Sequence, residues 1–171
     1  ADPVFDAYVN SLLAAKRLEV CSTTIPQMAI PMIFGNEKYP AHLKKRADIF
    51  DQRAKQAYNA LNNIPGVKVN CPSGAFYMTI LFEDGVLNNR RTLKIANPAI
   101  KEKVESLVGG VANDQRFVYY LMGATGICVV PLSGFYCKRE GFRITLLECD
   151  NVKRAWMLET LADALREYLA S

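Results

Sequence analysis

The order in which helical and strand-like patterns follow one another constrains the fold of this chain most strongly. Helical spacing of apolar residues dominates the N-terminal third, and short apolar strands come later, in pairs joined by turn residues. A parallel sheet would need a regular alternation of strands and helices, which the sequence lacks. We therefore predict a fold of the α+β or α/β class, with helices packed on a small, mostly antiparallel sheet.

Capping residues and apolar spacing set the bounds of the expected elements. Asp2 and Pro3 begin the first helix, and Asn97, Asn113 and Asn151 begin three later ones. The last helix carries one apolar stripe at positions 152, 155, 156, 161, 165, 168 and 169. We expect helices at 3–18, within 22–36 (short and buried, ending near Gly35), and at 43–61, 97–108, 113–125 and 151–169, with strands at 67–71, 75–82, 127–131 and 142–147.

Composition excludes several classes of protein. A length of 171 residues fits one domain or slightly more, and 50% hydrophobic with 22% charged residues argues against disorder. The net charge of +4 is too small and too evenly spread for a dedicated nucleic-acid binder. No apolar run approaches the roughly 20 residues of a membrane span. The chain begins at Ala1 without Met, so we expect a processed end or a piece of a longer protein.

The five cysteines predict neither disulfides nor a zinc site. They stand at positions 21, 71, 128, 137 and 149, an odd number without Cys-x-x-Cys spacing. Three of them lie inside apolar runs, as reduced cysteines do in the cores of cytosolic proteins. Metal-ligating residues do not cluster at the spacings of known metal sites. We therefore expect a cytoplasmic protein without a metal ion.

The sequence lacks the common motifs that identify the catalytic or nucleotide-binding residues of an enzyme. The only histidine, His42, lies at the start of a charged amphipathic helix and is expected to face solvent. The sequence has no Gly-x-Ser-x-Gly element, no phosphate-binding Walker loop and no Gly-x-Gly-x-x-Gly. These motifs therefore predict no catalytic residue.

One charged residue stands inside an otherwise apolar strand. Arg143 is the second residue of Phe-Arg-Ile-Thr-Leu-Leu at 142–147. A guanidinium is costly to remove from water unless an anion meets it, and its planar fork matches a carboxylate. Two interpretations stay open. Arg143 pairs at the strand end with Glu140 or Glu148, or it awaits the carboxylate of a substrate.

A second feature is the passage from the strand at 127–131 into Leu132-Ser133-Gly134-Phe135-Tyr136. Small residues followed by two aromatic ones fit a plain connection between strands. They also fit a loop whose backbone comes close to a bound ligand. The residues alone leave both interpretations open.

Together these features resemble one protein family. The stretches 125–135 (Thr-Gly-Ile-Cys-Val-Val-Pro-Leu-Ser-Gly-Phe) and 140–147 (Glu-Gly-Phe-Arg-Ile-Thr-Leu-Leu) are similar to the C-terminal part of class I aminotransferases, which are fold-type-I pyridoxal-phosphate enzymes. Residues 65–77, from Pro-Gly-Val to Gly-Ala-Phe-Tyr, and Pro-Gln-Met-Ala at 26–29 resemble the alanine aminotransferase branch. The resemblance covers most of 20–171 and is weakest over 84–112.

The resemblance implies a domain organisation, an activity and site residues. Residues 1–35 would be the trailing part of the large cofactor-binding domain, and 36–171 the small C-terminal domain with an insertion at 84–112. The full-length protein would be a cytosolic homodimer that uses pyridoxal phosphate to transfer an amino group between an amino acid, with alanine as a candidate, and a 2-oxo acid such as 2-oxoglutarate. Arg143 would hold the substrate α-carboxylate, and Gly74, Ser133 and Phe135 would lie near the substrate entrance.

The chain also departs from the family pattern. Leu132 and Tyr136 replace two glycines of Pro-Gly-Ser-Gly-Phe-Gly. None of the eleven lysines lies in the Ser-x-x-Lys context of the Schiff-base lysine, and the cofactor-binding Asp, Ser and Arg are missing. We therefore expect no catalytic or cofactor-binding residue in this chain, and no activity from it alone. Two alternatives stay open: an aspartate or aromatic aminotransferase or related lyase, and a non-catalytic binding module with the small-domain fold.

Overall fold

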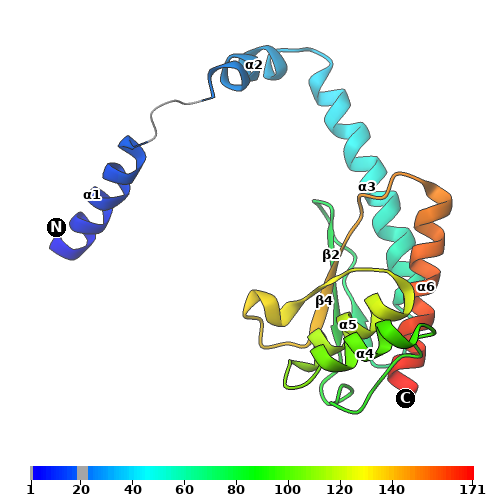
Figure 1. Cartoon of the computed structure of the whole chain (residues 1–171). Helices are drawn as coiled ribbons and strands as arrows, with labels where there is room; N and C mark the ends of the chain where they lie inside the picture. Colours follow the sequence, from blue (N-terminus) through cyan, green and yellow to red (C-terminus); the bar gives the residue numbers. More distant parts are fainter. Residues whose placement is uncertain (1, 19–22) are drawn as a thin grey trace. The chain divides into compact units, whose positions relative to one another are not determined.

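A computed structural model describes residues 2–18 and 23–171 (Figure 1). Contacts between residues divide the chain into two compact units, Ala1–Lys45 and Arg46–Ser171. The second unit contains the sheet and the hydrophobic core. Cys21, one of the five cysteines, lies outside the described residues.

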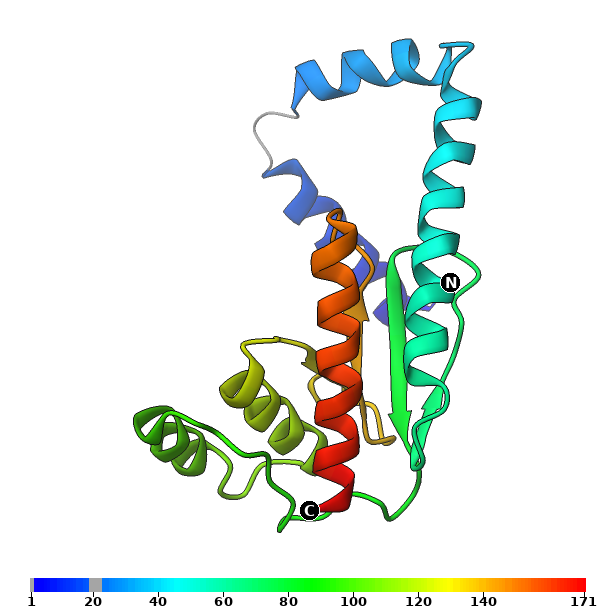
Figure 2. The ribbon, with the colours of Figure 1, turned by 90° about the vertical axis from the view of Figure 1, so that its right-hand side faces the viewer.

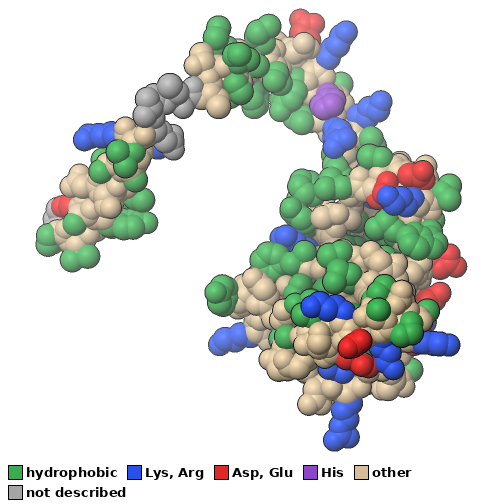
Figure 3. All heavy atoms as spheres, viewed as in Figure 1, with side chains coloured by type: hydrophobic (Ala, Val, Ile, Leu, Met, Phe, Trp, Pro, Cys, Tyr) green, Lys and Arg blue, Asp and Glu red, His purple; other side chains and the backbone are tan. Residues whose placement is uncertain are grey.

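The N-terminal unit is helical. Helix α1 (Pro3–Arg17) begins where the Asp2 carboxylate accepts the backbone N–H of Val4, as the capping pattern predicts. Helix α2 (Thr24–Phe34) ends at Gly35. No residue of either helix is buried, so the prediction of a buried helix within 22–36 is wrong for the described chain. Hydrophobic side chains cover the visible surface of α2 in Figure 3, which is the composition of a helix normally packed inside a protein.

Four strands form one antiparallel sheet in the second unit. Their order in the sheet is β1-β2-β4-β3, and the predicted hairpin is present, with Val67 opposite Phe82. This sheet with its covering helices confirms the predicted fold class. The strands are β1 (Val67–Val69), β2 (Tyr77–Phe82), β3 (Val130–Pro131) and β4 (Gly141–Thr145).

Helices cover one face of this sheet. Figure 2 shows α3 and α6 side by side along the sheet, and α5 beside them contacts β3 and β4. Helix α4 packs on α5 rather than on the strands. Helix α3 (Tyr39–Leu61) begins in the N-terminal unit and enters this one at Arg46. The other helical elements of the unit are α4 (Pro98–Leu107), α5 (Asn113–Thr125), the 3-10 turn η1 (Leu132–Phe135) and α6 (Asn151–Ala170).

The hydrophobic core lies between the sheet and these helices. Met78, Ile80 and Phe82 alternate along β2 and are all buried, because successive strand residues point to opposite faces. Burial of such side chains stabilises a fold by about 1.5–3 kcal/mol each. Aromatic rings from both layers meet at centroid distances of 5.0 to 5.8 Å in a cluster of Phe82, Phe117, Phe142 and Tyr168.

Helix α6 differs from its prediction in its first half. Asp150, not Asn151, caps it through the side-chain carboxylate. The predicted apolar stripe is buried only over the C-terminal half, whereas Val152 and Trp156 are 80% and 52% exposed. Arg154 is buried instead, because its guanidinium donates hydrogen bonds to three oxygen atoms of neighbouring residues.

The connections between elements hold the cysteines. Three of the five cysteines were expected in the core, but the four that the structure describes are all exposed free thiols, so this prediction is wrong for the described chain: Cys71, Cys128, Cys137 and Cys149. Each lies in a connecting segment, and such segments run over the protein surface. Cys128 is not part of a strand because β3 pairs with β4 only at Val130 and Pro131.

Residues 84–112, expected to be an insertion, contribute to the packed domain. Asn97 caps α4 as predicted, by accepting the N–H groups of Ala99 and Ile100. Val104 of α4 is buried in the core. Arg91 donates hydrogen bonds to the carbonyl oxygens of Tyr168 and Ser171 at the end of α6, where carbonyl groups lack the backbone N–H of a following helical turn. None of the described helices combines the length and the apolarity that crossing a membrane requires.

Candidate functional site

Arg143 lies in β4, on the sheet face that the helices do not cover. It stands opposite Thr79 of β2 and Val130 of β3. Paired residues of neighbouring antiparallel strands project to the same face, whereas the adjacent Phe142 projects into the core. The Arg143 side chain is partly buried. The alternation of β4 therefore places a guanidinium on the face of the sheet away from the core.

Two aromatic rings lie against this guanidinium. Its central carbon is 4.1 Å from the ring centroid of Tyr77, in β2, and 4.4 Å from that of Phe135, in η1. Each such cation–π contact contributes about 0.5–2 kcal/mol and shields the guanidinium from water. Sequence analysis did not identify Tyr77, although alternation along β2 places it on the same face as Thr79. The two rings hold the guanidinium while its N–H groups remain able to bind an anion.

The strand-end ion pair considered from the sequence is absent from residues 2–18 and 23–171. Glu140 accepts a hydrogen bond from the Asn113 side chain, with 2.8 Å between Nδ2 and Oε1. Glu148 pairs with Lys153 at 3.1 Å. A hydrogen bond from a backbone N–H, together with Lys153, lowers the pKa of the Glu148 carboxyl. Both acids are thus engaged elsewhere, and the Arg143 guanidinium has neither an ion pair nor a hydrogen bond within the described chain.

Leu132 and Tyr136, the two departures from the family pattern, have different surroundings in the segment after β3. Tyr136 stands where that pattern has glycine, and it has φ 56° and ψ 23°, the left-handed conformation that glycine adopts readily. Its side chain is 99% exposed. Leu132, at the other changed position, is buried and therefore serves packing.

Gly74 and Ser133, the remaining predicted site residues, make no hydrogen bond to Arg143 in the described chain. Ser133 is in η1, and its backbone N–H donates a hydrogen bond to a neighbouring helix. Gly74 is in the connection before β2, three residues from Tyr77, and a Cβ there would meet no atom within 4 Å. The structure thus brings Phe135 and Tyr77 to Arg143, whereas no hydrogen bond from Gly74 or Ser133 to Arg143 is found among the described residues.

Two arginines missed by the sequence analysis fix the chain just after β4. Arg53 of α3 donates hydrogen bonds from Nη1 to the carbonyl oxygens of Leu146 and Leu147, at 2.9 and 3.3 Å. Arg154 of α6 donates from Nη1 to the carbonyl oxygen of Glu148 at 2.9 Å. Hydrogen bonds from α3 and α6 therefore fix the position of the segment that follows β4.

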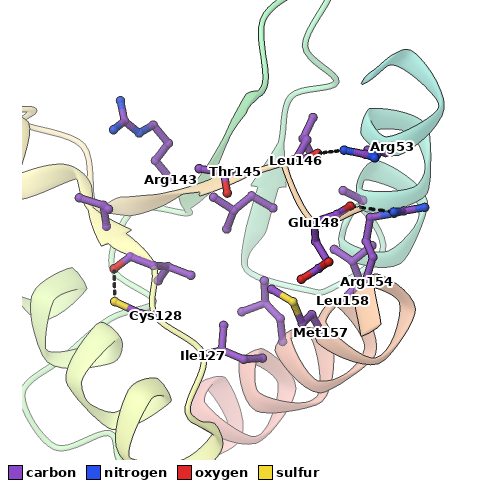
Figure 4. A pocket seen from close by; sticks show the side chains of 15 residues that line it. Arg53, Ile127, Cys128, Arg143, Thr145, Leu146, Glu148, Arg154, Met157 and Leu158 are labelled. Carbon is purple, nitrogen blue, oxygen red and sulfur yellow. Dashed lines mark hydrogen bonds between the residues drawn. The ribbon is translucent and has the colours of Figure 1, made fainter. Parts of the chain in front are cut away.

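A small cavity of about 120 Å³ lies beside this segment (Figure 4). Figure 4 shows the guanidinium of Arg143 pointing away from Met157 and Leu158, which line the cavity. No lysine lines this cavity. His42 is not part of it and lies exposed on α3, as predicted. The described part of the chain contains no group of three or more residues able to hold a metal ion. Arg143 itself lines the cavity together with Arg53, Glu148 and Arg154, so its walls are charged as well as apolar, and the Arg143 guanidinium lies at the end away from Met157 and Leu158.

The known proteins reported below as similar to this chain are all described as aminotransferases. Residues 4–157 match the family model for aminotransferase class I and II. An uncharacterised aminotransferase of Methanocaldococcus jannaschii is 46% identical over 168 residues, which cover 98% of this chain and 39% of that protein. A probable mitochondrial alanine aminotransferase of Dictyostelium discoideum is 32% identical over 75% of this chain and 23% of its own length. The chain therefore spans less than half the length of these relatives.

A solved structure agrees in fold. The aspartate aminotransferase of Rhizobium meliloti is similar with a TM-score of 0.54 and 28% identity, over 74% of this chain and 27% of that one. The family match extends over both the sheet and the segment that carries Arg143 up to α6. This chain belongs to the aminotransferase class I and II family.

Proposed function

We propose that the complete protein is a pyridoxal-phosphate-dependent aminotransferase, and that Arg143 binds the α-carboxylate of its substrates. The observation that carries this proposal is a partly buried guanidinium that touches two aromatic rings and has no acidic partner in the described chain. Amino acids and 2-oxo acids differ at the α-carbon but share the α-carboxylate. A site for that group therefore serves both directions of an amino transfer.

The geometry suits this role. The two parallel N–H groups of a guanidinium bind both oxygens of a carboxylate at about 2.7–2.9 Å. Tyr77 and Phe135 restrict how the Arg143 side chain can rotate, so less entropy is lost when the carboxylate binds. Binding at two points also fixes the direction of the α-carbon, which is where the reaction occurs.

We expect no site for pyridoxal phosphate itself among the described residues. Lysine forms the Schiff base with this cofactor, yet the cavity behind β4 has no lysine in its lining. Lys55, on α3, pairs with Asp51 at 2.7 Å, and the hydrogen bond to that carboxylate raises the pKa of the Lys55 amine. We propose that the Schiff-base lysine lies in a part of the complete protein outside this chain. The chain alone is expected to transfer no amino group.

The finer assignments follow from the resemblance. Alanine with 2-oxoglutarate is the first candidate substrate pair, supported by the similarity of residues 65–77 to the alanine branch and by the name of the Dictyostelium relative. An aspartate aminotransferase is the second candidate, because a solved structure of that name has the same fold. A homodimer in the cytoplasm is what the family leads us to expect.

The test compares substrates with and without the carboxylate. In the complete protein, the rate of the amino-donor half-reaction is measured with alanine and with ethylamine, which lacks only that group. Arg143→Ala should reduce the preference for alanine about 100-fold, because loss of one partner of a desolvated charge pair costs about 2–5 kcal/mol. Arg143→Lys should give a preference for alanine between those of the wild type and Arg143→Ala, because lysine supplies the charge without the planar guanidinium.

Arg166→Ala is the matched control. Arg166 is an exposed arginine of α6 that pairs with Asp163 three residues away, and it should leave the preference unchanged. An Arg143→Ala enzyme that still prefers alanine as strongly as the control would refute the assignment. A complete protein that binds amino acids but transfers no amino group would support the non-catalytic alternative.

A further inference from the structure

Asp114 is a buried carboxylate at the beginning of α5. It is 1% exposed, and its Oδ2 accepts a hydrogen bond from the backbone N–H of Ser133 at 2.9 Å. Its Oδ1 has no hydrogen-bond partner among the described residues. A helix N-terminus favours a negative charge, but a buried carboxylate with one hydrogen bond remains costly. Asparagine would offer the same oxygen at a lower desolvation cost, so the charge itself requires an explanation.

The partner of Asp114 is the turn that carries Phe135. Ser133 and Phe135 are both in η1, and the Phe135 ring lies 4.4 Å from the central carbon of Arg143. One hydrogen bond, one short turn and one ring contact therefore connect Asp114 to the guanidinium. No other side-chain hydrogen bond to the backbone of η1 is found in the described chain.

The same helix turn holds the far end of this segment. The Asn113 side chain donates a hydrogen bond to Glu140 at 2.8 Å, so α5 binds both ends of residues 133–140. Between these points Tyr136 has a positive φ and an exposed side chain, a conformation that tyrosine does not favour by itself. The two contacts with α5 therefore support the shape of the segment, together with backbone hydrogen bonds from Tyr136 and Cys137 inside the turn.

We propose that Asp114 is a positioning residue for substrate recognition: its carboxylate holds the Ser133 turn so that Phe135 keeps the Arg143 guanidinium aligned for the substrate carboxylate. This inference rests on the function proposed above for Arg143. A charged acceptor explains the choice of aspartate, because hydrogen bonds from backbone N–H groups to carboxylates are shorter and about twice as strong as those to neutral acceptors. Asp114 itself touches no substrate.

The experiment uses the complete protein and the same pair of donors, alanine and ethylamine. Asp114→Ala should lower the preference for alanine about tenfold, which corresponds to about 1.4 kcal/mol. Turnover of ethylamine, which does not use Arg143, should change less than about twofold. Asp114→Asn keeps the shape and one acceptor oxygen, and its loss should be about threefold. If Asp114→Ala does not fold, the asparagine variant provides the same comparison.

Phe135 supplies an internal check. Phe135→Ala should reproduce the loss of preference, and the double variant with Asp114→Ala should be no worse than the larger single effect, since both act through one ring. Asp163→Ala is the matched control, because Asp163 is an exposed carboxylate on α6. Losses in the double variant that add in full would overturn the proposed route through Phe135.

Two outcomes separate this inference from the proposed function. If Arg143→Ala abolishes the preference for alanine but Asp114→Ala behaves like Asp163→Ala, the positioning role is wrong and the carboxylate site stands. If Arg143→Ala has no effect, the proposed function itself fails. An Asp114→Ala enzyme that loses activity equally toward alanine and ethylamine shows a merely structural role and also overturns the inference.

Discussion

Replacing Tyr136 by glycine should stabilise the folded domain. Its φ of 56° lies in the left-handed region, which costs a non-glycine residue about 1–2 kcal/mol. Glycine avoids this cost but loses about 0.5–1 kcal/mol more backbone entropy on folding. The tyrosine side chain is 99% exposed and contributes little packing. The expected net result is a free energy of unfolding higher by about 0.5–1 kcal/mol.

Urea unfolding of the 171-residue chain, followed by circular dichroism, measures this difference. Tyr136→Ala is the matched control, because it removes the same side chain but keeps the Cβ that makes the conformation unfavourable. Its free energy of unfolding should stay within about 0.5 kcal/mol of the wild type. Equal gains in both variants would show that the tyrosine side chain, rather than the backbone angle, is unfavourable, and would refute the reasoning.

Four other predictions concern the core and the lysines. Gly141→Ala should lower the free energy of unfolding by about 2 kcal/mol or more, because a Cβ there clashes with the carbonyl oxygen of Ile80; an unchanged melting temperature would contradict this. Tyr168→Phe should raise it by about 1 kcal/mol, because the buried hydroxyl has no hydrogen-bond partner among the described residues. Burial also raises the pKa of Tyr168 from 10.0 to about 12, so the unfolded chain ionises first and stability falls between pH 10 and 12; the phenylalanine variant should lose this part of the fall, and identical pH profiles would disprove it. Incubation of the chain with pyridoxal phosphate and borohydride should label no single lysine stoichiometrically by mass spectrometry, whereas one fully labelled site would place the Schiff-base lysine here.

Elements with local signals were predictable from the sequence. Asn97 caps α4 through its own side chain, and Gly126 ends α5 with φ 76°, so both bounds depend on nearby residues only. The burial of α6 was not predictable in the same way. Arg154 is buried because Gln56, on another helix, accepts its hydrogen bond, and no pattern within α6 indicates this. Burial depends on which surfaces of different elements pack together, and the spacing of residues along one helix does not specify that.

The candidate site was predictable in its charge but not in its surroundings. A lone arginine in an apolar strand identified Arg143, because the cost of burying a charge is a property of the residue itself. Whether Glu140 would neutralise it depended on Asn113, which lies 27 positions away and holds that carboxylate. The contact with Tyr77 depended on strand register, which only the folded sheet fixes.

The most direct measurement is a crystal structure of the complete protein with a bound 2-oxo acid or amino-acid analogue. The account predicts both oxygens of the α-carboxylate at about 2.7–2.9 Å from nitrogen atoms of Arg143. Tyr77 and Phe135 should still lie against the guanidinium, as they do in the chain alone. An α-carboxylate held by other residues, with Arg143 paired to a protein acid, would contradict the central claim.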